Sequence, residues 1–367
     1  MALKTGMVGL TNVGKTTIFN ALTASDIEPS NYTFATIDPN KAIVNVPDDR
    51  VDEIFNNIES AKKVYNTLDV VDIAGLIKGA SSGEGLGNKF LADIKQVDAV
   101  LHVVRCFEDD NIIHVDNSVN PLRDIETIEA ELIIKDLETV TKRIEKNVKL
   151  VRARDKDAMA REPLYIKIKN ALEELVHPRD MNLTDDEIES LTDLNLITLK
   201  PQIFVCNISE DELLAKKPSS LTTKVMDYAA SKNCVAVPIC GKVEAEISQL
   251  DDNEKSEFLS EYGLEEPGLN VLLKKAYNLL GLITFLTEGE IEVKAWNIKA
   301  GTLAPQAAGT IHTDFEKKFI KAEVISYSDF KECNFSRAEA KKKGIARLEG
   351  KTYEIKDGDV IIFRVGQ

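Results

Sequence analysis

Residues 9–16 of this chain read Gly-Leu-Thr-Asn-Val-Gly-Lys-Thr, which fits the pattern G-x-x-x-x-G-K-[ST]. The two glycines let the backbone curl so that successive N–H groups point at phosphate oxygens. We expect Lys15 to reach the β- and γ-phosphates of a nucleotide, and the Thr16 hydroxyl to ligate Mg²⁺. An apolar strand precedes this segment and an amphipathic helix over residues 17–23 follows it, as the pattern requires. The sequence therefore predicts a nucleotide-binding α/β domain.

Composition limits the classes of protein to consider. The chain has 367 residues, 43% hydrophobic and 29% charged, which is ordinary for a globular protein of two or three domains. Its net charge of −15 argues against indiscriminate affinity for nucleic acid, so any RNA contact needs a local basic patch. The five cysteines form no close pair and no metal-binding spacing, and no leader or membrane span is recognised. We therefore expect a protein of the reducing cytoplasm, without DNA or membrane partners.

Apolar segments with β-strand character alternate with helical ones through most of the chain. This alternation is typical of a doubly wound parallel sheet. The expected strands are residues 4–8, 42–46, 67–73, 99–104, 202–207 and 234–239.

A charged segment interrupts this pattern after Pro121. Apolar residues recur every three or four positions from Ile133 to Val151, which predicts an antiparallel helical hairpin or short coiled coil with a solvated tip at residues 152–161. We expect the insertion to span residues 123–195, and the nucleotide-binding domain to comprise residues 1–122 and 196–280.

A third unit is expected over residues 282–367. Its predicted strands are residues 290–296, 321–325 and 360–365, with a break at 305–309 and a helix over 336–347. The pattern indicates a compact α+β domain.

Residues 72–75 read Asp-Ile-Ala-Gly at the end of an apolar strand, as the D-x-x-G element of a switch NTPase does. We expect Asp72 to hold Mg²⁺ through water and the Gly75 amide to bond the γ-phosphate. Thr36 is the favoured switch threonine for the metal, and Thr33 is the alternative. Further glycines up to residue 87 suit a segment that becomes ordered when triphosphate binds.

Leu76 follows this element at the place where Ras-like enzymes carry a water-orienting glutamine. Either hydrolysis is slow and partner-dependent, or another group orients the water. The candidates are His102, His114 and the glycine-rich backbone. We favour His114, because His102 lies in an apolar strand and is expected to be a core residue.

The element that reads the base departs from the guanine-specific N-K-x-D. Here it is Asn207-Ile208-Ser209-Glu210, so the acid is one methylene longer and the lysine is lost. A displaced carboxylate cannot make the paired hydrogen bonds that select guanine, which favours ATP over GTP. Asn12 could also supply an oxygen to K⁺ bridging the phosphates, or simply cap the loop.

In these motifs the chain resembles the YchF / Obg-like ATPase family, over nearly its whole length. The residues that carry the resemblance are 9–16 (GLTNVGKT), 34–40 (FATIDPN), 72–88 (DIAGLIKGASSGEGLGN), 103–107 (VVRCF), 207–210 (NISE) and 308–315 (AGTIHTDF). The departures are Thr11, where many members have proline, and Cys240-Gly241 in place of Ser-Ala after the last strand.

The resemblance implies an Obg-type P-loop domain with a helical insertion and a C-terminal TGS domain of ubiquitin-like β-grasp fold. It further implies Mg²⁺-dependent ATP hydrolysis and association with ribosomes. By the same resemblance, phosphate-loop roles pass to Asn12, Val13, Gly14, Lys15, Thr16 and Thr17, metal roles to Thr16 and Thr36, and adenine contact to Ile208.

A patch for rRNA or a ribosomal protein is then expected among lysines 317, 318, 321 and 341–343. Two alternatives remain: an ordinary Obg-type GTPase, and a nucleotide-gated binding module with little turnover, which Leu76 favours.

Overall fold

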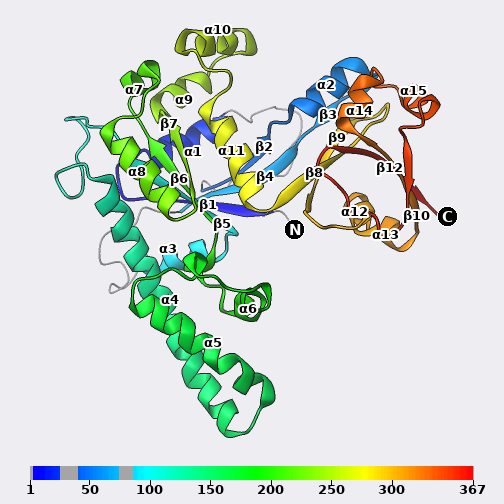
Figure 1. Cartoon of the computed structure of the whole chain (residues 1–367). Coiled ribbons are helices and arrows are strands. Elements are labelled where there is room, and N and C mark those ends of the chain that lie inside the picture. Colours follow the sequence, from blue (N-terminus) through cyan, green and yellow to red (C-terminus); the bar gives the residue numbers. More distant parts are fainter. Residues whose placement is uncertain (1–2, 25–39, 74–85, 367) are drawn as a thin grey trace. The chain divides into compact units, whose positions relative to one another are not determined.

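The computed structural model describes residues 3–24, 40–73 and 86–366 (Figure 1). It divides into two compact units: a first of residues 1–44 and 69–272, and a second of residues 45–68 and 273–367. Among the described residues, no helix combines the length and the apolar character that crossing a bilayer requires.

The first unit is built on a six-stranded sheet with the order β2-β4-β1-β5-β6-β7. β1 pairs in parallel with β4 and β5, and β5, β6 and β7 continue in parallel. The strands are β1 (Lys4–Val8), β2 (Lys41–Val46), β4 (Asn66–Asp72), β5 (Ala99–Arg105), β6 (Gln202–Asn207) and β7 (Val235–Ile239). All six predicted strands are confirmed to within one residue at each end.

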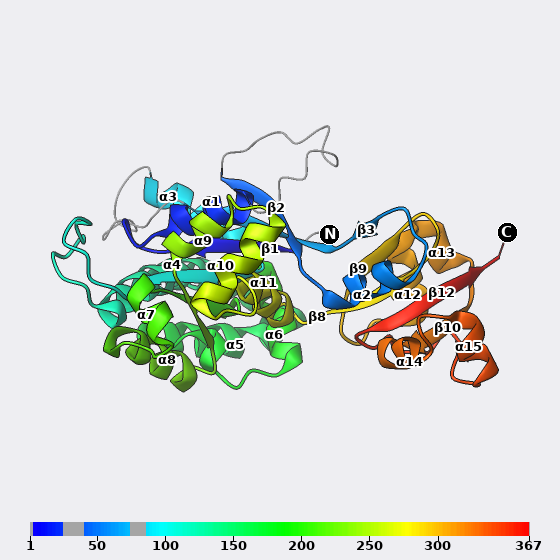
Figure 2. The ribbon, with the colours of Figure 1, turned by 90° about the horizontal axis from the view of Figure 1, so that it is seen from above.

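Helices cover both faces of this sheet, which confirms the doubly wound fold. Figure 2 shows α1 (Lys15–Ala24) and α9 (Gly241–Ile247) on one side, and α4 (Pro121–Arg152) and α8 (Ser220–Ser231) on the other. α3 (Leu86–Lys95) lies beside α4, where Nζ of Lys95 donates a hydrogen bond to the Thr139 hydroxyl (3.1 Å) (Figure 1). The remaining helices of this unit are α7 (Glu210–Ala215), α10 (Asp252–Tyr262) and α11 (Gly268–Leu279), whose last residues belong to the second unit.

The predicted helical hairpin is α4 followed by α5 (Lys156–Glu173). Pro121 begins α4 where its missing N–H costs nothing, and the Asn120 side chain accepts a hydrogen bond from the Arg123 N–H. The seam buries Ile133 and Val140 with Tyr165, Ile168 and Leu172 of α5, and Leu137 and Ile144 are partly buried against them. The expected positions nearest the turn, Val148 and Val151, are only half-buried and lie outside this cluster. The turn is shorter than predicted, because α5 already begins at Lys156.

Short elements return the chain from the hairpin to β6. They are α6 (Asp185–Leu191) and three 3₁₀ turns at Pro178–Asp180, Thr192–Leu194 and Ile197–Leu199. Leu191, Leu194 and Leu196 complete the apolar cluster of the hairpin, so this return segment packs with the insertion as we expected.

The second unit has a sheet with the order β11-β10-β12-β8-β9-β3. β8 lies parallel to β12, whereas β8–β9, β10–β12 and β10–β11 are antiparallel, and α12 lies between β9 and β10 in the chain. This is the β-grasp topology that the resemblance implied; the TGS assignment itself stays a prediction. The strands are β3 (Lys63–Val64), β8 (Leu282–Thr287), β9 (Val293–Lys299), β10 (Phe319–Ser326), β11 (Arg347–Glu349) and β12 (Asp359–Val365).

The helices of the second unit are short. They are α2 (Asp49–Asn57), α12 (Ala304–Ile311), α13 (Thr313–Lys317), α14 (Tyr327–Glu332) and α15 (Arg337–Lys342). We had expected a break at residues 305–309, but Pro305 stands in the first turn of α12, where a helix tolerates proline.

Residues 45–68 differ from the expected domain boundaries. Val51 and Ile54 of α2 are fully buried with Leu286, Val293 and other residues of the C-terminal core. The strand–helix–strand pattern of this segment resembles the surrounding nucleotide-binding domain, so the sequence alone could not reveal which core it joins.

Candidate functional site

The phosphate-binding segment connects β1 to α1, as predicted. Gly14 has φ +89°, and a Cβ added there would lie 2.1 Å from Nδ2 of Asn207, so this position requires glycine. Val13 is buried, whereas Thr16 and Thr17 are exposed in the first turn of α1. The N–H groups of this turn therefore begin a helix whose positive end faces the site of the phosphates.

Lys15 and Asp72 form an ion pair at the carboxyl ends of β1 and β4. The register pairs Met7 with Asp72, which brings the end of β4 beside the phosphate-binding loop. Both side chains are about nine-tenths buried, so each charge is stabilised by the opposite charge of its partner. The structure thus brings together the predicted phosphate cation and the predicted metal-associated carboxylate.

The donor set fits a metal that is held mainly by nucleotide and water. Among the described residues, no group of three or more His, Cys, Asp and Glu side chains could hold a metal ion. Mg²⁺ in P-loop proteins uses one hydroxyl, phosphate oxygens and waters, with an acid acting through water. Thr16 and Asp72 supply that hydroxyl and that acid. Thr33, Thr36, Gly75 and Leu76 lie outside the described residues.

A cavity of about 990 Å³ opens next to the phosphate-binding loop. Six predicted nucleotide-site residues contribute to its wall: Asn12, Gly14, Thr17, Asn207, Ile208 and Glu210. The rest of the wall comes from the loop after β5, from the start of α7, from α9 with the residues before and after it, and from Phe258 of α10.

Asn207 joins the two loops that border this cavity, the phosphate-binding loop and the loop before α9. Its buried side chain donates from Nδ2 to the carbonyl of Val13 (2.9 Å) and accepts at Oδ1 from the N–H of Gly241 (3.0 Å). The Ile208 N–H donates to the carbonyl of Ile239 (2.9 Å), so this N–H is already engaged within the protein. Asn207 thus joins the loops at the two ends of the cavity.

Both carboxylate oxygens of Glu210 are already engaged. Oε2 lies 2.7 Å from Nζ of Lys242, and Oε1 accepts a hydrogen bond from the Tyr262 hydroxyl (2.6 Å). The hydrogen bond from Lys242, followed by that from Tyr262, lowers the pKa of Glu210, and the carboxylate in turn raises the pKa of Tyr262 to about 12. Neither Lys242 nor Tyr262 was singled out from the sequence.

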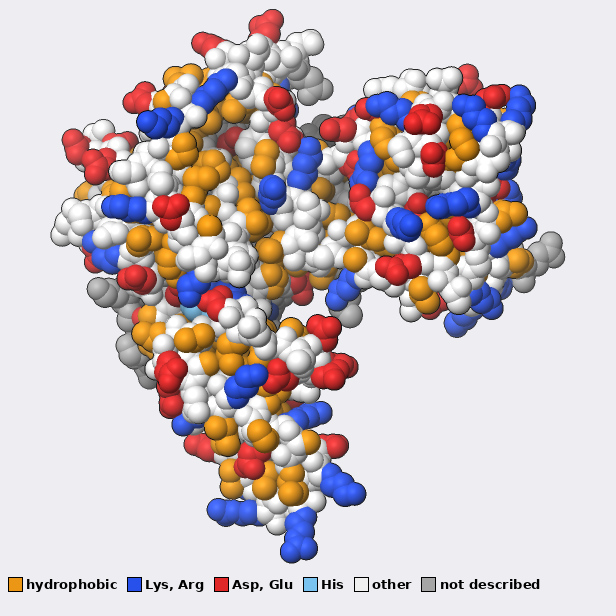
Figure 3. Space-filling view, in the orientation of Figure 1, with side chains coloured by type: hydrophobic (Ala, Val, Ile, Leu, Met, Phe, Trp, Pro, Cys, Tyr) orange, Lys and Arg blue, Asp and Glu red, His pale blue; other side chains and the backbone are white. Residues whose placement is uncertain are grey.

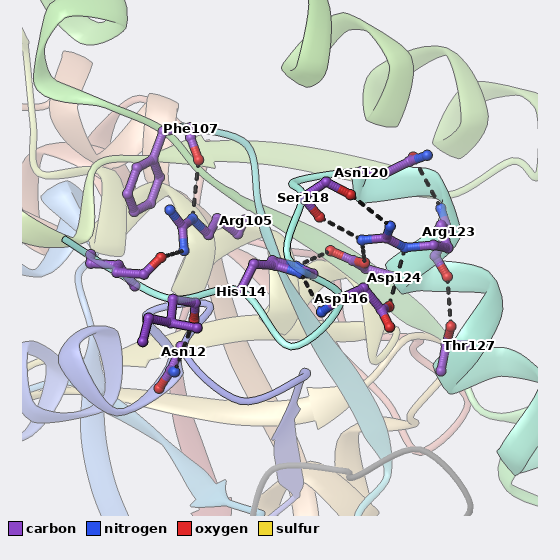
Figure 4. Close-up of polar contacts among 12 residues, drawn as sticks. Asn12, Arg105, Phe107, His114, Asp116, Ser118, Asn120, Arg123, Asp124 and Thr127 are labelled. Carbon is purple, nitrogen blue, oxygen red and sulfur yellow. Dashed lines mark hydrogen bonds and ion pairs between the residues drawn. The ribbon is translucent and has the colours of Figure 1, made fainter. Parts of the chain in front are cut away.

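Arg105 organises the loop of residues 107–113 that borders the cavity (Figure 4). Its buried guanidinium donates to the carbonyls of Phe107 (3.0 Å), Ile112 (2.9 Å) and Asp109 (3.1 Å), and it lies over the Phe107 ring. The neighbouring carbonyl of Ile113 accepts from Nδ2 of Asn12 (3.1 Å). This loop is therefore linked to the phosphate-binding segment through the side chain of Asn12.

His114 lies at the far end of the same loop and is buried. Its Nδ1 accepts from the N–H of Asp116 (3.1 Å), so Nε2 carries the proton that is donated to Asp124 Oδ2 (2.9 Å) (Figure 4). Arg123 holds the other oxygen of Asp124 (3.1 Å). In this arrangement both ring nitrogens are occupied, and the imidazole points at the start of α4.

His102 is the core residue that we expected. It is 2% exposed, its Nδ1 lies 3.2 Å from Nε2 of Gln202, and burial lowers its pKa to about 4.

The comparisons with known proteins agree along the whole chain. Residues 282–366 match the YchF-GTPase_C family, described as a protein of unknown function, and residues 4–151 match MMR_HSR1, described as a 50S ribosome-binding GTPase. The chain is 48% identical over 364 residues to the ribosome-binding ATPase YchF of Bacillus subtilis (strain 168), covering 99% of both. The chain belongs to the YchF family.

Two further relatives of this YchF-family chain carry different names, one as an ATPase and the other as a GTPase. The ribosome-binding ATPase YchF of Escherichia coli O157:H7 is 47% identical over 363 residues, with 99% of both chains covered. The structure of the Schizosaccharomyces pombe YchF GTPase superposes with a TM-score of 0.89 at 38% identity, covering 99% of this chain and 97% of that one. The choice between ATP and GTP must therefore be argued from the base pocket.

One residue beside the pocket predicts a pH-dependent stability. Glu244 of α9 is buried and accepts from the N–H groups of Gly268 (2.7 Å) and Leu269 (3.4 Å). Burial raises its pKa to about 7, although these two hydrogen bonds act in the opposite direction. The folded state therefore retains the proton that an unfolded glutamic acid loses near pH 4.5.

We expect wild-type stability to fall relative to Glu244→Gln as pH rises from about 4.5 to about 7, by on the order of 3 kcal/mol, and then to level off. Urea unfolding of both proteins at about pH 5.5 and about pH 8 measures this difference. A difference that stays constant over this range would show that the folded carboxyl titrates normally.

Proposed function

We propose that this chain is a Mg²⁺-dependent ATPase of the cytoplasm that binds ribosomes and prefers ATP to GTP. The observation that carries the proposal is the pairing of an intact phosphate-binding loop with a base pocket whose acidic residue is held by Lys242 and Tyr262. The names of the bacterial relatives support ATP and the ribosome, and five free cysteines suit a reducing compartment.

Phosphate binding follows from the loop and the ion pair beside it. The N–H groups of the loop and of the helix end donate hydrogen bonds to the phosphate oxygens. Lys15 leaves its ion pair with Asp72 and binds the β- and γ-phosphates instead. Asp72 would then be free to act on a bound Mg²⁺ through water. Thr16 and Thr36 would hold that ion, which would neutralise part of the phosphate charge.

Base preference follows from the engaged carboxylate. Guanine needs both oxygens of an acid for its N1–H and N2 amino group, whereas adenine presents an acceptor at N1, which an ionised carboxylate repels. Because Lys242 and Tyr262 hold Glu210, the Ile208 carbonyl is left to accept from the adenine N6 amino group. This arrangement favours ATP.

We expect the purified protein to bind ATP at least about tenfold more tightly than GTP, and to release phosphate over many turnovers. Competition titration gives the two affinities, and phosphate release with and without ribosomes gives the turnover. Tighter binding of GTP would favour the Obg-type GTPase, and the absence of turnover in both conditions would favour the nucleotide-gated module.

The double variant Lys242→Met with Tyr262→Phe tests how the preference arises. Freeing Glu210 should narrow the ATP-to-GTP affinity ratio by about tenfold, mainly through weaker ATP binding. Lys63→Met with Tyr65→Phe removes the same two side-chain types from a carboxylate of the second unit, Asp52, and should leave the ratio unchanged. An unaltered ATP-to-GTP affinity ratio in the first variant would show that Glu210 does not set the nucleotide preference.

We also propose that His114 orients the attacking water, once its Nε2 leaves Asp124. The Asn12–Ile113 hydrogen bond links its loop to the phosphate-binding segment, so triphosphate binding at Asn12 can be transmitted to the loop. His114→Ala should lower kcat by at least about tenfold and change ATP affinity less than about twofold. The control is His312→Ala, at an exposed histidine of the second unit. Equal turnover by the parent and by His114→Ala would refute the water-orienting role of His114.

K⁺ is proposed as a second ion at the phosphates, with Asn12 as a ligand. Because Nδ2 of Asn12 is held by Ile113, its Oδ1 is the atom left for a cation. Turnover in KCl should exceed that in NaCl several-fold, and Asn12→Ala should remove the difference. Equal rates in both salts would leave Asn12 as a loop-capping residue.

Ribosome contact is proposed for the lysines of the second unit. Lys341 and Lys342 are paired with Glu323 (3.0 Å) and Glu339 (2.6 Å), whereas the structure places no carboxylate of the described residues against Lys317, Lys318 or Lys321. The latter three therefore offer the less compensated charge for a phosphate backbone.

A further inference from the structure

The loop that joins β5 to α4 exposes large apolar side chains next to the nucleotide cavity. We define the β5–α4 loop as residues 106–120, which lie between these two elements. The side chains of Ile112, Ile113 and Val115 are 37%, 75% and 44% exposed. In both ribbon views the loop projects away from the sheet of the first unit (Figure 1, Figure 2). Three large aliphatic side chains within four residues form an apolar patch, which indicates an interaction site where a single exposed side chain would not.

The nucleotide cavity does not account for this patch. Ile112 belongs to the cavity wall, but Ile113 and Val115 do not. His114, which lies between them in the chain, is buried, so the loop has an inner face and the patch belongs to its outer face. Neither the core nor the nucleotide therefore explains why the outer face is apolar.

Carboxylates surround the patch. Residues 108–116 contain no Lys or Arg and four acids, Glu108, Asp109, Asp110 and Asp116. Asp116 is paired with Arg123 (3.3 Å). Glu108 and Asp110 are exposed, and the structure places no cation of the described residues in an ion pair with either of them. Figure 3 shows Asp and Glu side chains at the outer end of this loop, at the left of the view, so the surface is both apolar and negatively charged.

Hydrogen bonds hold the loop in one arrangement. The Arg105 guanidinium donates to three of its carbonyls. Oδ1 of Asp109 accepts from the N–H of Asn111 (2.9 Å), and the N–H of Asn117 donates to the carbonyl of His114 (3.0 Å). A surface that is already ordered loses little conformational freedom when a partner binds to it.

We propose that the β5–α4 loop is a docking surface for a basic, amphipathic segment of a protein. Apolar side chains of the partner cover Ile113 and Val115, and its Lys or Arg side chains pair with Glu108 and Asp110. RNA does not fit this surface, because the carboxylates repel its phosphates and residues 108–116 contain no aromatic side chain on which a base could stack. The inference rests on the proposed function in one respect, because we take a basic protein of the ribosome as the partner.

The position of the loop gives such a partner access to the nucleotide site. The Ile113 carbonyl accepts from Nδ2 of Asn12 (3.1 Å), and His114 is the next residue. A partner that covers the Ile113 side chain therefore contacts the loop where it is linked to the phosphate-binding segment.

The first test uses the full-length chain and a labelled helical peptide of about 18 residues, made of Lys and Leu with all Leu on one face, titrated by fluorescence anisotropy. The variant Asp110→Asn, Ile113→Ser should bind this peptide at least about tenfold more weakly than the parent. The matched control Glu290→Gln, Ile291→Ser makes the same change in net charge in the second unit, where Ile291 is 76% exposed, and should bind like the parent. ATP affinity of both variants verifies that the nucleotide-binding domain is folded.

Photocrosslinking to purified ribosomes then identifies the partner. The variant Ile113→benzoylphenylalanine should crosslink to a ribosomal protein of net positive charge, and Ile291→benzoylphenylalanine should do so far less. For a parent that sediments with ribosomes, a crosslink from position 113 to rRNA or to this chain itself would overturn the proposal, as would one no stronger than that from position 291.

Two results of the peptide titration would also overturn the proposal: equal affinity of the loop variant and the parent, and equal weakening by the loop variant and the control. Failure of the proposed function is a separate outcome. If the parent binds the peptide through this loop but does not sediment with ribosomes, the docking surface stands and ribosome association is refuted.

Discussion

The side-chain amide of Asn207 is the constraint on which the nucleotide site depends. It joins the phosphate-binding loop, through Val13, to the loop that begins α9, through Gly241. Each bond is buried, so losing either leaves a polar group unsatisfied at a cost of about 1–3 kcal/mol. One residue therefore sets the distance between the phosphate-binding loop and the loop that begins α9, the segment in which we propose that the base binds. Gly14 completes the constraint, because any side chain there would displace the amide.

Much of this arrangement could be predicted from the sequence, because parallel strands align their carboxyl ends. The motifs at Gly9–Thr16, Asp72 and Asn207 each follow a strand, so strand assignment alone brings them to one edge of a sheet. What could not be predicted is which side chains contact one another at that edge. Lys242 and Tyr262 reach Glu210 from segments 32 and 52 residues away, and no local pattern marks either of them as a partner.

The same limit applies to α2 and to the turn of the hairpin. Periodicity assigns Val51 and Ile54 a buried face but does not identify the core that receives it, and they join the C-terminal sheet. The hairpin was predictable from its apolar spacing, whereas its turn is shorter than predicted because α5 begins at Lys156. Asp155 ends the turn by capping α5, a short-range signal that a run of charged residues conceals.

The hairpin is not an independent appendage, because a buried ionic cluster attaches its base to the sheet. Glu129 of α4 accepts from Arg179 (3.0 Å) and from the Tyr228 hydroxyl of α8 (2.6 Å), and it lies 3.5 Å from Nε2 of His177. Burial alone would raise the pKa of Glu129, but His177, Tyr228 and Arg179 lower it to about 2. The carboxylate is therefore ionised at any physiological pH, and removing one partner would leave an uncompensated buried charge. Because α4 begins at the residues that hold His114, the same cluster also fixes the position of the loop that borders the cavity relative to the sheet.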